Sequence, residues 1–185
     1  MKNGIHKERK TLTEKHRGAR DQQKVAVRLP DGSQIDLSPG KHNELQRLIL
    51  EEFAPRFASG ALLIYLGDTA KKDRLLHLPS FNRIGLKISS HEKLPDVILL
   101  DEDRDWIFLI EAVTSHGPVS PKRLEELSRL LTPVRVPPVY VTAFLNFSDF
   151  HKYGKDIAWE TEVWIAEHPD HMIHYNGDRF LGPRS

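Results

Sequence analysis

The stretch LPDVILLDEDRDWIFLIEAVTSHGPVSPKR, residues 94–123, contains two apolar segments joined by a short acidic loop. Segments 94–100 and 105–113 have the length and the β-branched and aromatic content of buried strands. Pairing of the two segments as a hairpin would bring Asp96, near the start of the first, and Glu111, near the end of the second, to one end of a sheet. The question is why so apolar a strand carries Glu111.

The residues that follow this hairpin predict a helix and a parallel strand. Ser120 has the character of an N-cap, and Pro121 suits the first helical position. One face of the predicted helix is apolar through Leu124, Leu127, Leu130 and Leu131. The apolar segment 137–144 is then reached by a crossover, so we expect it to lie parallel to strand 105–113.

The pattern of apolar residues before this hairpin changes from alternating to helical and then to a short apolar run. Alternating residues around the turn formers 30–32 predict a β-hairpin over 24–37. A helical period then predicts a helix that begins near Lys41 and stops before Pro55. Its buried face comprises Leu45, Leu48, Ile49 and Phe53. A further strand is predicted at 61–66.

The C-terminal part is predicted to add a helix at 146–159 and a closing hairpin at 162–177. This order of elements predicts an α/β fold with a mixed central β-sheet flanked by helices. The chain reads as one domain, 24–185, preceded by a basic arm, 1–23.

Two groups of side chains near the C-terminus favour structural interpretations. Trp159 and Trp164 are expected in the core rather than on a base-stacking platform. The histidines at 168, 171 and 174 lie around a predicted turn with no evident fourth ligand, so a polar hairpin is favoured over a zinc site.

Composition limits the possible classes of protein. The 185 residues include no cysteine, which excludes disulfides and thiolate zinc sites and favours a reducing cytoplasm. No apolar run has the roughly 20 residues needed to cross a bilayer, so no membrane association is expected. The net charge is only +1, but the N-terminal arm is rich in Lys and Arg. This arm is either a phosphate-binding segment or a solvated terminus.

Two carboxylates that converge at the end of a sheet suggest a site for a hard metal ion. Mg²⁺ is bound by one or two carboxylates together with waters and substrate phosphate, and Asp96 and Glu111 are of this type. An ionised glutamate among apolar neighbours is costly unless it is paired or metal-bound. The alternative is that Glu111 reaches water from a strand end and that Asp96 is a turn residue after Pro95.

The sequence around these acids resembles a known family. Pro95-Asp96 followed by Glu111 on the next strand is similar to the PD-(D/E)XK nuclease pattern. From about Val25 to Pro183 the chain resembles the catalytic C-terminal domain of the BsuBI/PstI family of type II restriction endonucleases. The stretches that carry this resemblance are SPGKHNELQRLILEEFAPRF, IYLGDTA, KLPDVILLDEDRDWIFLIEAVTSHGPVSPKR, VYVTAF and DIAWETEVWIAEHPDHMIHYNGDRFLGP.

The resemblance implies a PD-(D/E)XK restriction-endonuclease-like fold and Mg²⁺-dependent cleavage of double-stranded DNA at a short palindrome, of the CTGCAG kind. It also implies a homodimer that acts beside a cognate DNA methyltransferase. Members of the family usually carry a further N-terminal region, which we expect to be absent from this chain. Alternatives are a DNA-binding or interaction module with a degenerate nuclease site and a structure-selective repair nuclease of the same fold.

Carried over residue by residue, the resemblance makes Asp96 and Glu111 metal ligands and catalytic residues. The sequence departs from the PD-(D/E)XK pattern two positions after Glu111, where Val113 replaces lysine. Lys122 is the preferred substitute, because a side chain in the first turn of a helix leans back toward its N-terminal end. Lys93 is the less favoured alternative.

Further residues are expected around this pair of acids. Glu44 resembles an additional metal ligand that enzymes of this fold place on the first helix, with a solvated helix face as the alternative. Ser115, His116, Lys122 and Arg123 are predicted to contact DNA, and His116 either contacts the scissile phosphate or caps the turn. Tyr65 and Asp68 either line the same face or belong to an edge strand and its turn.

Overall fold

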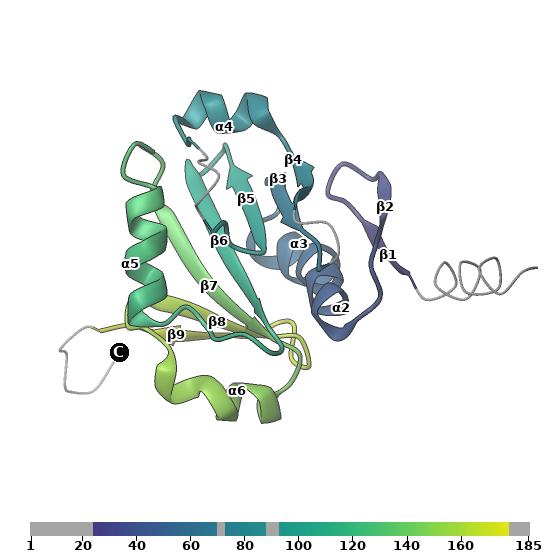
Figure 1. Ribbon diagram of the computed structural model, residues 1–185, viewed down its shortest axis with the longest axis vertical. Helices are drawn as coiled ribbons and strands as arrows, with labels where there is room; N and C mark the ends of the chain where they lie inside the picture. Colours follow the sequence, from purple (N-terminus) through teal and green to yellow (C-terminus); the bar gives the residue numbers. More distant parts are fainter. Residues whose placement is uncertain (1–23, 70–72, 88–92, 178–185) are drawn as a thin grey trace, which may run out of the picture.

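The computed structural model describes residues 24–69, 73–87 and 93–177, and the predicted basic arm at 1–23 lies outside them. A seven-stranded mixed sheet with the order β4-β3-β5-β6-β7-β8-β9 forms the centre of the fold (Figure 1). Its strands are β3 (Leu62–Gly67), β4 (Asp73–Leu76), β5 (Val97–Asp101), β6 (Trp106–Val113), β7 (Pro138–Phe144), β8 (Thr161–Ile165) and β9 (Met172–Tyr175). The predicted α/β class with a mixed central sheet is confirmed.

The central hairpin forms as its sequence predicts. Strands β5 and β6 are antiparallel, and Val97 pairs with Ile110. Strand β7 runs parallel to β6, and β8 runs parallel to β7. The crossover from β6 to β7 is made by helix α5 (Pro121–Leu130), whose N-cap Ser120 accepts a hydrogen bond from the backbone N–H of Arg123 at 3.3 Å.

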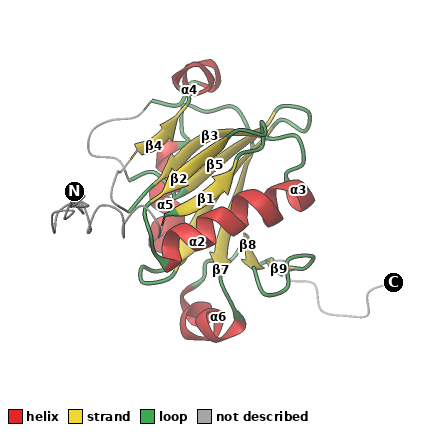
Figure 2. Cartoon of the chain, turned by 90° about the vertical axis from the view of Figure 1, so that its right-hand side faces the viewer, coloured by secondary structure: helices red, strands yellow, loops and turns green. Residues whose placement is uncertain are grey.

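Helices cover both faces of this sheet (Figures 1 and 2). One face is covered by helix α2 (Lys41–Leu48) and its continuation, beside the small hairpin of β1 (Val25–Arg28) and β2 (Gln34–Leu37). Helices α4 (Leu78–Ile84) and α5 pack on the other face, and α6 (Phe147–Tyr153) lies near the C-terminal strands. Among the described residues, no helix combines the length and apolar character needed to cross a membrane.

Alternation along β6 divides its side chains between the two layers. Phe108, Ile110 and Ala112 belong to the apolar cluster beneath α2, whereas Ile107 and Leu109 belong to the cluster beneath α5. Side chains two residues apart on a strand share a face. Glu111 therefore points to the α5 side of the sheet, as its contact with Arg123 of α5 also shows.

The first helix does not stop before Pro55, and this boundary was wrong. After α2 the chain forms a π-helical segment, Ile49–Phe53, and then α3 (Ala54–Phe57), so the helix runs through the proline. The N–H of Ala54 donates to the carbonyl of Ile49, which widens the turn just before the proline ring. Burial of Phe53 against the core outweighs the local cost of the proline.

The predicted helix at 146–159 is also shorter than expected. Helix α6 is followed only by a 3₁₀ turn, Gly154–Asp156, and Ile157 is extended and buried. The N–H of Ala158 donates to the carbonyl of Val119 at 2.9 Å, so a tertiary hydrogen bond replaces the helical one. Trp159 is 66% exposed, which contradicts its predicted place in the core, whereas Trp164 is fully buried as predicted.

Two elements had no local signal in the sequence. Strand β4 extends the sheet by pairing with β3, and α4 follows it and buries Phe81. Both are short, and neither shows a sustained apolar period. Their position is set by the edge of β3 and by the apolar cluster beneath α4 and α5.

Candidate active site

Asp96 and Glu111 lie side by side at one end of the β5–β6 hairpin. The backbone carbonyl of Asp96 accepts a hydrogen bond from Gly67 of β3 at 2.9 Å, and its Oδ2 accepts one from the N–H of Ala112 at 2.7 Å. Asp96 is thereby tied to both neighbouring strands. Its carboxyl group is also close enough to Glu111 for a hydrogen bond between the two side chains.

Glu111 occupies an environment that disfavours its charged form. Its side chain is only 14% exposed. Burial raises the pKa of Glu111 to about 7, the negative charge of Asp96 adds to this effect, and Arg123 opposes it. A cation that binds beside this carboxyl group would lower its pKa and cause it to release its proton.

Arg123 supplies a positive charge from the α5 side. Its Nε donates to Glu111 Oε1 at 2.7 Å, and a terminal nitrogen donates to the carbonyl of Lys93 at 3.0 Å. The remaining terminal nitrogen contacts Glu126 at 3.2 Å. The sequence predicted that Arg123 contacts DNA, and in the structure its guanidinium group binds Glu111, Glu126 and the carbonyl of Lys93.

His42 approaches the same pair from the α2 side and was missed in the sequence. Its Nε2 lies 3.2 Å from Asp96 Oδ1. Burial lowers the pKa of His42, but hydrogen bonds to Asp96 and the Ala112 backbone and the nearby negative charges outweigh it, so the pKa lies above the ordinary value. A histidine in the first turn of a helix gave no local sign of this contact.

These residues line a cavity of about 890 Å³. The predicted residues that it brings together are Tyr65, Asp68, Lys93, Asp96, Glu111, Ser115, His116, Lys122 and Arg123. Four basic side chains belong to this set, namely Lys93, His116, Lys122 and Arg123, and they come from the segment before β5, the turn after β6 and the first turn of α5. A cavity lined by two neighbouring acids and several basic side chains suits a phosphate-bearing ligand that is held through a metal ion.

Asp68 lines this cavity and contacts residues at the start of α2. Its carboxylate accepts hydrogen bonds from Ser38 Oγ at 2.9 Å and from the fully buried side chain of Asn43 at 2.6 Å. Asn43 Nδ2 also donates to the carbonyl of Ser38 at 2.8 Å. Tyr65 is buried and lines the cavity. This network fixes the start of α2 against the end of β3.

Glu44 does not line this cavity, contrary to its expected place beside the other acids. Its carboxylate is bound by Arg47, whose Nη2 lies 2.5 Å from Oε1. Glu44 and His42 are two positions apart on α2, and residues at that spacing face different directions on a helix. The inward position that was assigned to Glu44 therefore belongs to His42.

Val113 stands where the PD-(D/E)XK pattern has lysine, and the structure gives a physical reason. Its side chain is fully buried in an apolar cluster with Phe144, Ile157, Val163 and Ile165. A lysine at this position would carry its charge into the apolar layer between the sheet and α6. Lys122 is exposed in the first turn of α5 and lines the cavity.

The donor set fits a hard divalent ion. Within residues 24–69, 73–87 and 93–177, no group of three or more His, Cys, Asp or Glu side chains is arranged to hold a metal. A pair of carboxylates is sufficient for Mg²⁺, which keeps several water ligands. Asp96 and Glu111 form such a pair. Burial raises the pKa of Glu111, and the negative charge of Asp96 raises it further, so a bound cation would favour the charged form of Glu111.

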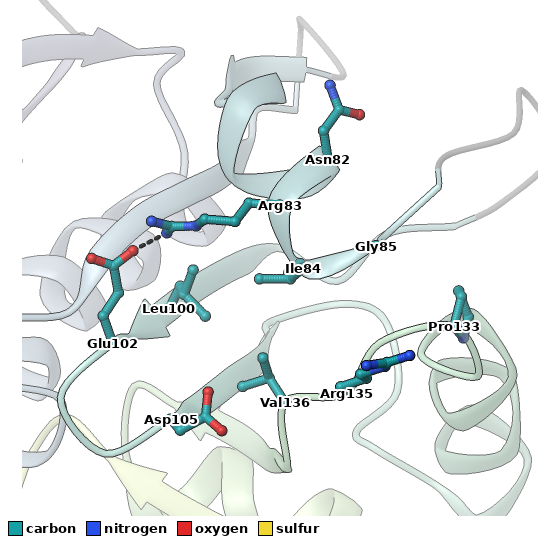
Figure 3. A pocket seen from close by; sticks show the side chains of 10 residues that line it. All are labelled: Asn82, Arg83, Ile84, Gly85, Leu100, Glu102, Asp105, Pro133, Arg135 and Val136. Atoms are coloured by element: carbon teal, nitrogen blue, oxygen red, sulfur yellow. Dashed lines mark hydrogen bonds and ion pairs between the residues drawn. The ribbon is translucent and has the colours of Figure 1, made fainter.

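A second cavity, of about 630 Å³, lies at the opposite end of the hairpin (Figure 3). It is lined by residues such as Leu100 and Val136, and an ion pair joins Arg83 of α4 to Glu102 of the β5–β6 loop. Neither proposed metal-binding carboxylate lines it. The first cavity is therefore the one associated with the two acids.

The environment of Glu111 predicts how stability depends on pH. Without metal, Glu111→Gln is expected to raise the free energy of unfolding at about pH 8 by roughly 1–3 kcal/mol. The carboxyl pKa is about 7 in the folded chain and near 4.5 without the fold, so the folded state holds the proton over this window and loses stability as pH rises through it.

Urea denaturation of both proteins in EDTA, at about pH 5 and pH 8, measures this effect. The advantage of the glutamine variant should shrink as pH falls toward the lower pKa. A difference that does not change between the two pH values would contradict the assignment of a buried, proton-binding Glu111.

Comparison with known proteins places these features in a wider context. Residues 25–178 match the sequence profile of the BsuBI/PstI restriction endonuclease domain. The chain is 47% identical over 175 residues to the type II restriction enzyme BsuBI of Bacillus subtilis. It is 31% identical over 179 residues to the type II restriction enzyme AplI of Arthrospira platensis. These alignments cover 95% and 92% of the chain, and 55% of each relative.

A solved structure shares the fold. The SdaI restriction endonuclease superimposes with a TM-score of 0.82 at 39% sequence identity, over 94% of this chain and 55% of the other. The chain thus spans about half the length of each of these relatives.

Proposed function

Because the chain belongs to the BsuBI/PstI restriction endonuclease family, we propose that it hydrolyses phosphodiester bonds of double-stranded DNA at a specific sequence. The observation that carries this proposal is the convergence of Asp96 and the largely buried Glu111 in a cavity bordered by basic side chains. Glu111 has a raised pKa without a metal, so binding of a divalent cation would be coupled to loss of its proton.

In the proposed reaction, Asp96 and Glu111 would hold Mg²⁺. The ion, when bound, supplies a water of lowered pKa and neutralises charge on the phosphate and the leaving oxygen. A water oxygen forms a bond to phosphorus and gives up a proton to the solvent, while the bond from phosphorus to the leaving deoxyribose oxygen breaks and that oxygen takes up a proton. Lys122 lines the cavity and would stabilise the charge that develops on the phosphate.

The family resemblance supports a finer proposal about substrate and partners. The target would be a short palindrome of the CTGCAG kind. Cleavage of both strands of a palindrome needs two copies of one site related by a twofold axis, which a homodimer provides. A cognate DNA methyltransferase would protect the host sequence, and both proteins would act in the cytoplasm.

Plasmid DNA incubated with the protein tests this function directly. Discrete fragments are expected with Mg²⁺, and intact plasmid is expected with EDTA. Mapping the fragment ends identifies the target sequence and the cut position. Absence of cleavage by a folded, metal-loaded protein would refute the endonuclease function.

The valine at the lysine position favours one alternative, a DNA-binding module with a degenerate nuclease site. Such a module would bind duplex DNA and leave it intact in Mg²⁺. A structure-selective repair nuclease would instead cut branched or flapped DNA in preference to a linear palindrome. Parallel assays on these substrates separate the three functions.

The basic arm should affect DNA affinity rather than chemistry. Residues 1–24 hold Lys2, Lys7, Arg9, Lys10, Lys15, Arg17, Arg20 and Lys24. Each phosphate contact releases counterions, so deletion of residues 1–23 is expected to flatten the dependence of affinity on salt by about 0.9 in slope per lost contact. Fluorescence anisotropy with labelled duplex across a salt series measures the slope. An unchanged slope would assign the arm no phosphate contact.

A further inference from the structure

We propose that His42 is a positioning residue that orients the Asp96 carboxylate for metal binding. The inference rests on the proposed function, because it assigns to His42 a part in the same site. The observation behind it is that the two oxygens of Asp96 have different partners on different elements. Oδ2 accepts the N–H of Ala112 at 2.7 Å, and Oδ1 lies 3.2 Å from His42 Nε2.

Two separate contacts define the plane of a carboxylate more closely than one. Ala112 belongs to β6 and His42 to α2, so Asp96 is held from the sheet and from the helix layer at once. Each carboxylate oxygen can accept more than one hydrogen bond, so both oxygens of Asp96 keep a lone pair for a metal ion. Partners of this type around a metal ligand fix its orientation and tune its affinity for the ion.

The backbone places His42 firmly at this point. Helix α2 starts after Gly40, whose φ of 144° lies in a region that other residues rarely adopt. The buried side chain of Asn43 binds Ser38 and Asp68, and the fully buried Leu45 anchors the next turn. The imidazole is only 20% exposed, and the Ala112 backbone beside it contributes to the raised pKa of His42. Its position is therefore defined on both sides.

His42 acts from the face of the sheet opposite to Arg123. Arg123 binds Glu111 from α5, and His42 binds Asp96 from α2. Asp96 therefore has a basic partner on one face of the sheet, and Glu111 has a basic partner on the other face. An entering Mg²⁺ would compete with Arg123 for Glu111, whereas the Asp96 oxygen bound by His42 can keep its partner and still donate a lone pair to the ion.

Three substitutions distinguish positioning from packing. His42→Gln offers an amide nitrogen close to the place of Nε2, His42→Asn reaches only to the place of Nδ1, and His42→Leu removes the donor but fills the space. His151→Gln, on the exposed side of α6, is the control for loss of a histidine elsewhere. Each full-length variant is assayed for plasmid cleavage and for the rise in melting temperature caused by Mg²⁺ without DNA.

His42→Leu and His42→Asn are expected to need about 10- to 100-fold more Mg²⁺ for half-maximal cleavage, with a matching loss of Mg²⁺-induced thermal stabilisation. His42→Gln should recover to within about tenfold of the parent protein, because the hydrogen bond and not the ring carries the role. DNA affinity in EDTA should be the same for all variants.

The proposal is overturned if His42→Leu responds to Mg²⁺ like the parent protein, or if His42→Gln is no better than His42→Asn. The second comparison decides the matter should the leucine variant fail to fold. Parent protein that never cuts DNA would refute the endonuclease function instead, and the thermal response to Mg²⁺ would still report on His42.

Discussion

Replacement of either acid of the pair, Asp96→Ala or Glu111→Ala, is expected to reduce Mg²⁺-dependent DNA cleavage below detection. Both carboxylates sit at one end of the β5–β6 hairpin, and Mg²⁺ needs carboxylate ligands as well as waters and phosphate. Loss of one ligand prevents the ion from binding. A bound metal ion stabilises the charge of the transition state by several kcal/mol, so the barrier to hydrolysis rises without it.

The fold should survive these substitutions. Asp96→Asn is the sharper variant, because an amide oxygen can still accept the N–H of Ala112 while the charge is lost. Glu125→Ala is the matched control, since Glu125 is 68% exposed and pairs with Arg129 on the outer side of α5. Cleavage rates over a Mg²⁺ series, with circular dichroism spectra, compare the four variants with the parent protein. A parental cleavage rate in Asp96→Ala or Glu111→Ala would show that the site is misassigned.

Lys122→Met is expected to lower the cleavage rate by about 10²-fold or more while DNA binding persists. The position two residues after Glu111 is a buried valine, so it cannot provide a cation beside the attacking water. Lys122 lines the same cavity from the first turn of α5, and methionine preserves the length of its stem without the ammonium group.

Two further variants separate the possible roles of this lysine. Lys122→Arg keeps the positive charge but cannot release a proton, so it preserves the rate if Lys122 stabilises charge and lowers it if Lys122 transfers a proton. Lys155→Met, on an exposed lysine after α6, is the control. Single-turnover cleavage and anisotropy binding measure rate and affinity independently. A parental rate in Lys122→Met would pass the role to His116, which also lines the cavity.

The sequence by itself determined the part of the fold that carries the two acids. Apolar strands joined by an acidic loop predicted the hairpin, and the register observed places Asp96 and Glu111 at the same end. A serine cap followed by proline predicted the start of α5, where the structure has it. These signals are local, because strand period, turn chemistry and helix caps are each encoded within a few residues.

Local rules failed where contacts distant in the chain decided the structure. The helix continues through Pro55 because Phe53 is buried against Phe108 and Trp164. Trp159 is exposed because the chain leaves α6 to bury Ile157 and to bond Ala158 to Val119. Propensity is a weak guide wherever tertiary packing supplies more free energy than the local preference costs.

The partners of the two acids depended on the tertiary structure alone. Asp96 contacts His42 of α2, which is far from it in the sequence. Glu111 contacts Arg123 of α5, which follows the turn after β6. The sequence pointed to Glu44 on α2 and gave no sign of His42, and the rotation of α2 on the sheet places His42 and not Glu44 at the cavity. That rotation follows from burial of Leu45 and Ile49 in the core, because the apolar face of a helix fixes where all its other side chains point.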